Sequence, residues 1–258
     1  MFYAIWCVKY GSAVPEAMEL MQLRRDAEDE IAMEDFRIML TARFFDGNSD
    51  MGIINFDVDG QEAELPTMRQ ENGKCMSLSD FVIPADSGRK SVFGMFAVSV
   101  HKKSKAHVQG CSCPACSNAY EDMIGRTVRM TIAEAASAWL DTKIASPGSK
   151  LIKPAAGYSS CPDHTLKGDI LKILCGHVHF SEETCSCGHC HGSHGLGIEL
   201  TESYAMTPES SICGLIFMHP EACYPEIRKI SQKQYDEYSS QRDMDPDKAR
   251  RFLGHLLK

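Results

Sequence analysis

Two short cysteine runs carry the most reactive side chains of this 258-residue chain. Both follow the pattern C-x-C-x-x-C, and their six thiols are Cys111, Cys113, Cys116, Cys185, Cys187 and Cys190. This spacing lets three thiolates converge from one loop, because proline or glycine between them permits tight turns. Three thiolates and one imidazole complete a tetrahedral zinc site, and His191 directly follows the second run. The runs therefore predict metal binding, with a structural zinc ion as the first choice.

The cysteine runs also allow other arrangements. The two runs could share one site or hold an iron–sulfur cluster, or they could be loops with reduced, unligated thiols. Clustered thiols in a reducing compartment usually indicate metal or redox chemistry rather than disulfides. The apolar run Met1–Val8 has no preceding positive charge and ends at Lys9. We therefore interpret it as a buried strand rather than a signal peptide, and we expect a cytoplasmic protein.

A second distinctive pattern consists of the run Lys153–Lys167 (KPAAGYSSCPDHTLK) followed by Leu200–Met206 (LTESYAM). Neither half is a common turn or helix pattern. In this order the two runs resemble the S-adenosylmethionine-binding signature of the reactivation domain of cobalamin-dependent methionine synthase. The resemblance extends from about Met51 to the C-terminus. Further segments that resemble the family, in family order, are Leu78–Pro84, Phe93–Val98, Ile132–Leu140, Gly197–Met206 and Gly214–Pro220.

The resemblance implies a shallow groove for S-adenosylmethionine. Gly157 would bring the backbone close to the ligand, because no Cβ stands in the way. Tyr158 would lie beside the sulfonium and the corrin, and His164 would face the cobalamin-carrying module. The residues for which the resemblance implies ligand contact are Glu134, Lys153, Ala155, Gly157, Tyr158 and Tyr224. Taken alone, Glu134 has the character of a solvated helix charge and Tyr224 that of ordinary packing, so only the joint pattern supports the site.

Two departures from the family pattern bear on ligand binding. The family carries an arginine where this chain has Lys153, and lysine offers a point charge where arginine grips a carboxylate with two hydrogen bonds. Loss of such a contact would weaken binding by about 1–2 kcal/mol. The family also has an acidic residue before its first helix that binds the ligand's amino group. Residues 1–14 offer no convincing counterpart.

Hydrophobic periodicity indicates the elements that must position these residues. Helical patterns cover Val14–Ala42, Ala119–Thr142, a short segment from Asp163 or Thr165 to Leu174, and Pro246–Lys258. The expected apolar stripe of the long helix consists of Met123, Ile124, Val128, Ile132, Ala135, Ala136 and Trp139. Strand patterns cover Met51–Val58, Gln61–Met68, Leu78–Pro84, Val92–Val100 and Ser211–Met218, with a turn at Asp59-Gly60.

These elements predict the α+β class. Strands and helices alternate without βαβ regularity, so we expect a single domain with a twisted, largely antiparallel sheet flanked by helices. No G-x-G-x-x-G loop follows a strand, which argues against a Rossmann methyltransferase. We assign residues 1–50 to an N-terminal strand and helical segment and residues 51–258 to the activation-like domain. Cysteine-rich insertions lie near 105–118 and 176–196.

Charge and composition limit the partners. A net charge of −8, with 43% apolar and 24% charged residues, is typical of a soluble protein and gives no basic face for nucleic acid. We expect neither nucleic acid nor a membrane as a partner. The chain has no D-x-H-x-x-G cobalamin motif. The resemblance therefore implies that cobalamin is carried by a separate methionine synthase chain, with an electron donor such as a flavodoxin-like protein.

The resemblance implies one function, and the cysteine runs indicate an alternative. The first is reductive reactivation of cobalamin-dependent methionine synthase, a methyltransferase of methionine biosynthesis. In it the chain binds S-adenosylmethionine and presents the methyl group to cob(I)alamin. The alternative is a non-catalytic interaction module that binds zinc or an iron–sulfur cluster and retains the activation-domain fold.

Overall fold

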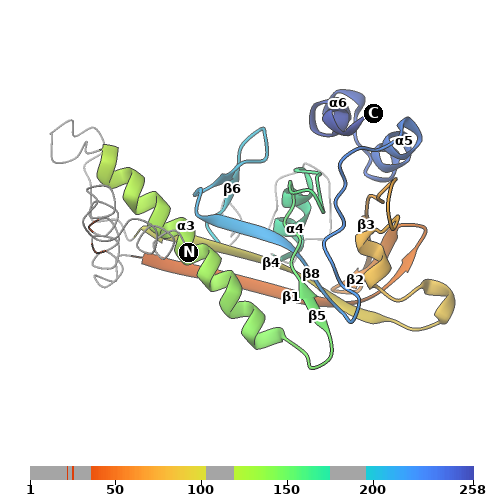
Figure 1. Cartoon of the computed structure of the whole chain (residues 1–258), viewed down its shortest axis with the longest axis horizontal. Helices are drawn as coiled ribbons and strands as arrows, with labels where there is room; N and C mark the ends of the chain where they lie inside the picture. The colour runs from red at the N-terminus through yellow and green to blue at the C-terminus, as the bar shows by residue number, and fades with distance from the viewer. Residues whose placement is uncertain (1–21, 23–24, 26–35, 103–118, 175–195) are drawn as a thin grey trace.

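A six-stranded sheet runs through the part of the chain that the computed structural model describes, namely residues 22, 25, 36–102, 119–174 and 196–258 (Figure 1). Its strands are β1 (Phe36–Asp50), β2 (Ile53–Val58), β3 (Gln61–Pro66), β4 (Ser91–Lys102), β5 (Lys150–Ile152) and β8 (Ser211–His219). They are hydrogen-bonded in the order β3-β2-β1-β4-β8-β5, and every neighbouring pair is antiparallel. The expected α+β class and antiparallel sheet are confirmed.

Tight turns connect the first three strands. The β2–β3 turn lies at Asp59-Gly60, as predicted, and both residues have positive φ values, 55° and 86°. Two consecutive positive φ values are typical of the two-residue hairpin turns that match strand twist. The Asp57 carboxylate accepts a hydrogen bond of 2.8 Å from the Gly60 backbone N–H. A separate two-stranded hairpin is formed by β6 (Glu199–Leu200) and β7 (Met206–Thr207).

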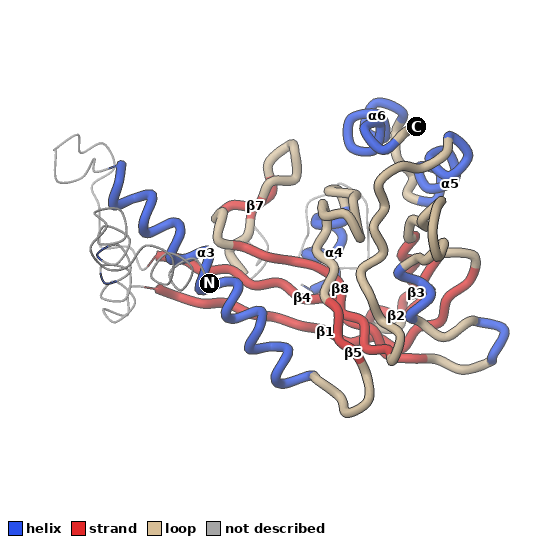
Figure 2. Tube along the Cα trace, in the orientation of Figure 1, coloured by secondary structure: helices blue, strands red, loops and turns tan. Residues whose placement is uncertain are grey.

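Helices cover both faces of the sheet (Figures 1 and 2). The long helix α3 (Ala119–Ile144) crosses one face, and α4 (Leu166–Leu174) packs on the other. The alternation of side chains along a strand explains this arrangement. Phe96 of β4 belongs to the apolar cluster beneath α3, whereas its neighbour Met95 belongs to the cluster beneath α4. None of the helices in the described residues combines the length and apolar character needed to cross a membrane.

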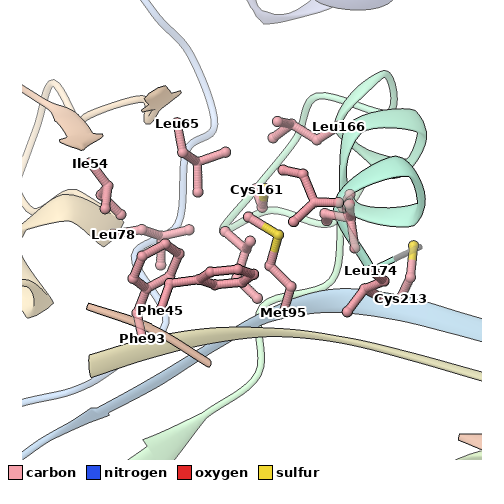
Figure 3. Packing of buried hydrophobic residues seen from close by; sticks show 14 of the residues in the cluster. Phe45, Ile54, Leu65, Leu78, Phe93, Met95, Cys161, Leu166, Leu174 and Cys213 are labelled. Carbon is pink, nitrogen blue, oxygen red and sulfur yellow. The ribbon is translucent and has the colours of Figure 1, made fainter. Parts of the chain in front are cut away.

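The larger apolar cluster lies between the sheet and α4 (Figure 3). Three phenylalanine rings from adjacent strands meet at its centre. The ring centroids of Phe45 and Phe93 are each about 5 Å from that of Phe56, at 5.2 and 5.1 Å. Edge-to-face contacts of this kind add to the stabilisation from burial. This cluster fixes the position of α4 and therefore one side of the site described below.

The C-terminal segment adds α5 (Gln232–Gln241) and α6 (Pro246–Leu253), which pack with each other beyond the β3 end of the sheet (Figure 1). Both helices begin with side-chain caps. The Ser231 hydroxyl accepts from the Gln234 N–H, and the Asp245 carboxylate accepts from the Lys248 N–H, with Pro246 at the first helical position. The predicted terminal helix is therefore confirmed from Pro246, although it gives way to a 3₁₀ turn at Gly254–Leu256.

Three predictions of local structure are corrected. Residues 36–42 are not helical but form the first half of β1, where Leu40 and Ala42 contact the α3 side and Met39 the α4 side. This alternation is a strand pattern that the acidic, methionine-rich residues before it obscured. The rest of the expected Val14–Ala42 helix, apart from residues 22 and 25, and the expected strand Met1–Val8 lie outside the described residues. The division of the chain at residue 51 stays a prediction, and residue 51 itself lies in the turn between β1 and β2.

The other two corrections concern Leu78–Pro84 and Trp139. The first segment begins with a 3₁₀ helix, Leu78–Phe81, because Ser77 and Asp80 form a capping box at its start. On α3, the expected stripe is rotated. The most buried positions are Val128, Ala133 and Leu140, whereas the Trp139 side chain is 55% exposed and lies under the Lys143 ammonium.

Glu71, in the loop after β3, holds the C-terminus in place. Its carboxylate contacts the Lys258 ammonium and accepts a hydrogen bond from the Ser231 backbone N–H. The hydrogen bond from Lys258, followed by that from Ser231, lowers the pKa of Glu71 from 4.5 to about 2. The ionised carboxylate is therefore favoured in the folded chain.

A Glu71→Gln variant is expected to lose stability in a pH-dependent way. A carboxyl group whose pKa is lowered by folding stabilises the protein above its ordinary pKa and loses this effect as the pH falls. The urea midpoint of the variant should therefore lie below that of the unmodified protein at pH 7, and the difference should shrink between pH 4.5 and about 2. Glu62→Gln, an exposed change on β3, serves as the control and should show no difference. A constant difference at all pH values would contradict this assignment.

Candidate functional site

An open groove of about 740 Å³ lies between α3, the loop that follows β5, the start of α4 and β8. The chain reaches it from segments far apart in sequence, including the β7–β8 connection and the loop after β8. Seven residues singled out from the sequence line this groove. They are Glu134, Lys153, Ala155, Gly157, Tyr158, His164 and Tyr224. The structure thus brings the predicted ligand-contacting and partner-facing residues together in one place.

The loop after β5 forms the floor of the groove and is held directly against β8. The Pro154 carbonyl accepts a hydrogen bond of 3.0 Å from the Leu215 N–H, and Ala155 forms an isolated bridge with Gly214. A Cβ at Gly214 would lie 2.5 Å from the Pro154 oxygen, so only glycine lets the loop cross the strand here. The sequence places Gly214 in the segment Gly214–Pro220, which resembles the family, but it assigns this glycine no role. A glycine within a strongly apolar strand could have indicated that another segment of backbone approaches the strand closely at this point.

Lys153 joins this loop to α3. Its ammonium contacts the Ser137 carbonyl, the Ser137 hydroxyl at 2.6 Å and the Asp141 carboxylate at 2.6 Å, and it lies 5.0 Å from the centre of the Phe96 ring. The Lys153 side chain is only 10% exposed. Its backbone N–H donates to the Tyr224 hydroxyl at 3.0 Å. The side chain expected to meet a ligand carboxylate therefore lies against partners within the protein.

Two aromatic residues stand at the mouth of the groove. Tyr158 is 72% exposed and Tyr224 is 55% exposed. The Tyr158 backbone is fixed on both sides, because its N–H donates to the Ala155 carbonyl and its carbonyl accepts from the Cys161 N–H at 2.8 Å. A rigid backbone beneath an exposed ring gives a flat apolar surface whose position is defined before any ligand arrives.

Gly157 and His164 are packed face to face. Gly157 has a φ of +94°, which few residues with side chains adopt, and its N–H donates to the Cys161 carbonyl at 2.7 Å. A Cβ at this position would lie 2.5 Å from Cε1 of His164. The missing side chain therefore provides the space that the imidazole occupies, which is a second reason for glycine besides access of a ligand to the backbone.

Lys167 sets the hydrogen bonding of His164. Its ammonium lies 3.0 Å from Nδ1 of His164 and donates to the Tyr204 carbonyl at 3.0 Å. An ammonium can only donate, so Nδ1 is an acceptor and the proton of the neutral ring is on Nε2. Burial lowers the pKa of His164 below 6.5, and the charge of Lys167 lowers it further, with smaller opposing and supporting effects from Asp163 and His255. His164 therefore lines the groove as a neutral imidazole at pH 7.

The state of His164 can be tested by nuclear magnetic resonance on the free protein. We expect its nitrogen shifts at pH 7 to show a proton on Nε2, and its titration midpoint to lie below 6.5. Lys167→Met should raise that midpoint, because the variant removes a positive charge next to the ring. The unmodified protein, titrated under the same conditions, serves as the reference. A proton on Nδ1 in the unmodified protein would contradict the assignment.

A buried network of charges holds the segment that carries His164. Asp163 is 1% exposed and accepts hydrogen bonds from the Thr165 N–H at 2.8 Å, the Thr165 hydroxyl at 2.7 Å and the Tyr238 hydroxyl at 2.9 Å. The Arg242 guanidinium lies 3.4 Å from Asp163 and 2.5 Å from Asp169. Burial raises the pKa of Tyr238 well above 10, so its hydroxyl remains a donor. The network ties α5 to the start of α4.

The sequence did not reveal several residues that build this site. Ser137 and Asp141 of α3 contact the Lys153 ammonium, although they are distant from it in the chain. Lys167 contacts His164 from about one helical turn further along the chain. Charge and hydrogen-bonding capacity alone could not distinguish them from other polar residues on the same helices.

The predicted metal ligands are the cysteines of the two cysteine runs and His191. All seven lie outside the described residues, namely Cys111, Cys113, Cys116, Cys185, Cys187, Cys190 and His191. Within residues 36–102, 119–174 and 196–258, no group of three or more histidine, cysteine or acidic side chains is arranged to hold a metal ion. Four cysteines are described, and they are free thiols. Burial raises the pKa of two of them, Cys161 and Cys213, to about 12, so both are protonated at neutral pH.

Comparison with known proteins supports the resemblance noted in the sequence. Residues 9–243 match the model of the family described as vitamin B12 dependent methionine synthase, activation domain. The chain belongs to this family. The activation-domain match spans the sheet, α3, α4 and α5, and thus every wall of the groove. The expectation of an activation-domain chain is therefore confirmed.

A solved structure shows the same activation-domain fold. The fold is similar to that in the crystal structure of the MetH reactivation domain bound to AdoHcy, with a TM-score of 0.75. The likeness covers 99% of this chain and 84% of that chain, at 22% sequence identity. At this level of identity the likeness establishes the fold of the activation domain. The roles of individual groove residues stay predictions.

Proposed function

We propose that this activation domain binds S-adenosylmethionine in the groove and presents its methyl group to the cobalamin-carrying module of a methionine synthase. The observation that carries the proposal is the convergence of Glu134, Gly157, Tyr158 and Tyr224 on one groove. The groove volume, about 740 Å³, is within the range of pockets that hold molecules of this size. The similar solved structure is of a reactivation domain bound to AdoHcy, which fits the same ligand class.

The groove residues supply positioning rather than acid–base chemistry. The exposed rings of Tyr158 and Tyr224 give flat surfaces for the apolar parts of the ligand and for its cationic sulfonium. Glu134, exposed on α3, supplies a carboxylate for polar groups of the ligand. The backbone at Ala155 and Gly157 can approach the ligand closely. Together they would hold the methyl group at a defined point above an open face, which is the main requirement for a methyl transfer.

The partner module has to meet this face. Cobalamin held by that module would supply the nucleophile, as cob(I)alamin formed from cob(II)alamin with one electron from a donor such as a flavodoxin-like protein, and S-adenosylhomocysteine would remain in the groove as the leaving group. Tyr158 stands at the mouth of the groove, and His164 offers a fixed N–H donor on the same loop and helix start. We propose that these two residues contact the cobalamin module when the proteins dock. The proposal makes the chain a component of a methyltransferase.

Titration calorimetry with S-adenosylmethionine tests the proposal. We expect binding to the unmodified chain, and we expect Tyr158→Ala to weaken it about tenfold, because an exposed aromatic surface is lost without loss of core packing. Trp139→Ala is the matched control, since Trp139 is exposed on α3 but does not line the groove. It should bind as the unmodified chain does.

A second experiment tests the reaction itself. The chain is mixed with a cobalamin-carrying methionine synthase module, a one-electron reductant and S-adenosylmethionine labelled in its methyl group. Label should appear on the cobalamin only when the chain is present. Binding without label transfer would contradict the reactivation role, whereas absence of binding both alone and with the module would contradict the ligand assignment.

The cysteine runs support a separate proposal of metal binding. We propose that the six thiols and His191 bind zinc in a structural role, with an iron–sulfur cluster as the alternative. Elemental analysis of protein purified without added metal distinguishes the two, because it reports zinc in one case and iron in the other. An iron–sulfur cluster would also colour the protein brown, whereas zinc would leave it colourless. Replacement of Cys113 and Cys187 by serine should lower the metal content. A metal-free unmodified protein would contradict the proposal.

A further inference from the structure

The positive and negative side chains that line the groove differ in how accessible they are to a ligand. Two lysines line it, Lys153 and Lys167, and both ammonium groups contact oxygen or nitrogen atoms of the protein. Three carboxylates also line it, Glu134, Asp141 and Glu209. Glu209 lies 3.6 Å from Arg126, and Glu134 is exposed. The groove therefore offers negative charge more readily than positive charge.

Lys153 is the cation expected to hold a ligand carboxylate, and its contacts argue against that role. This ammonium donates hydrogen bonds to the Ser137 carbonyl and the Ser137 hydroxyl, and it forms an ion pair with Asp141 Oδ1 at 2.6 Å. The ammonium nitrogen also lies 5.0 Å from the centre of the Phe96 ring. A ligand carboxylate would have to displace one of these partners.

Displacing Asp141 would be unfavourable. Its Oδ1 atom is buried and has no hydrogen-bond partner with good geometry in the described residues, so the Lys153 ammonium at 2.6 Å is its compensating charge. The Lys153 side chain is only 10% exposed and that of Asp141 is 40% exposed, so the covered ammonium is the member of the pair that depends more on its partner. The Lys153–Asp141 pair is therefore expected to persist when a ligand enters.

We propose that Asp141 determines ligand specificity by neutralising Lys153, so that the groove recognises S-adenosylmethionine without a charge pair to its carboxylate. This inference rests on the proposed function. The adenosine, the sulfonium and the amino group carry the affinity, and the accessible carboxylates favour the two cationic groups. Lys153 is a positioning residue that joins the binding loop to α3.

The test compares S-adenosylmethionine with its decarboxylated form, which keeps the sulfonium and the amino group. Calorimetry on the unmodified chain should give dissociation constants that agree within about threefold. In Asp141→Asn the side chain keeps its shape but loses its charge, so Lys153 becomes an uncompensated cation. S-adenosylmethionine should then bind about tenfold more tightly than the decarboxylated form. Asp141→Glu should restore the original ratio.

The double variant Asp141→Asn, Lys153→Met completes the design. It removes the freed cation, so the preference for the carboxylate should disappear again. Because both compounds are compared within each variant, a general loss of stability changes both constants and leaves their ratio unaffected. A preference of tenfold or more for S-adenosylmethionine in the unmodified chain, or an unchanged ratio in Asp141→Asn, overturns the inference while the proposed function stands. If neither compound binds the unmodified chain, the proposed function fails and the inference falls with it.

Discussion

A Gly157→Ala variant is expected to lose S-adenosylmethionine binding by about 100-fold or more. Two physical effects combine at this position. The φ of +94° is unfavourable for alanine, and the new Cβ would lie 2.5 Å from Cε1 and 2.6 Å from Nδ1 of His164. The imidazole or the loop must therefore move. Either movement shifts the backbone that forms the groove floor and breaks the contact between His164 and Lys167.

Gly148→Ala separates these two effects. Gly148 lies in the turn between α3 and β5 and has a φ of +82°, but a Cβ there would meet nothing within 4 Å. This control carries a similar backbone penalty, about 1 kcal/mol, without a steric clash. We expect it to lower stability slightly and to bind ligand normally. Equal ligand affinities of the two variants would contradict the packing argument, and a changed His164 resonance only in Gly157→Ala would support it.

An Arg242→Met variant is expected to lower the free energy of unfolding by about 3–5 kcal/mol. The guanidinium compensates Asp163 and Asp169, whose side chains are 1% and 15% exposed. Removal of one partner leaves buried carboxylates without a counter-charge, which costs far more than the loss of an ion pair in solvent. Urea unfolding followed by circular dichroism measures the change. Ligand binding should also weaken, because Asp163 directly precedes His164.

Arg228→Met is the matched control for that variant. Arg228 pairs with Glu226 at 2.6 Å, but the two side chains are 82% and 55% exposed. An exposed pair of this kind contributes about 0–1 kcal/mol. Tyr238→Phe provides an intermediate case, since it removes one neutral donor to Asp163 and should cost about 1–3 kcal/mol. A ranking in which Arg228→Met is as harmful as Arg242→Met would show that the network does not hold the segment.

The sequence predicted the elements whose periodicity is carried by many residues. Strands β2, β3, β4 and β8 and helices α3 and α4 lie where the pattern placed them, and the Asp59-Gly60 turn joins β2 to β3. The error at β1 has a physical cause. Its residues 36–42 can be aligned with either period, and the pairing with β4, a contact between residues about sixty positions apart, determines the outcome.

For the groove, the sequence predicted which residues line it but not which side chains contact one another. The family pattern placed Lys153 and Gly157 in the groove, and the structure brings both there. The pattern could not show that Asp141 would neutralise Lys153 or that His164 would fill the space beside Gly157. Both contacts depend on how α3 and α4 are positioned by the apolar clusters of the sheet. Such contacts follow from tertiary packing, which local sequence does not encode.

The walls of the groove come from Phe96 and from three stretches, around residues 134–141, 153–167 and 206–224, and the start of α4 is anchored by Arg242. During synthesis the ligand site can therefore form only after the chain up to residue 242 has left the ribosome. Closing contacts over such sequence separations is slow and concerted. A nascent or truncated chain that ends before residue 242 would already contain the sheet strands but would lack a finished binding floor. Competence to bind the ligand would thus appear only after the segment around residue 242 has folded onto the start of α4.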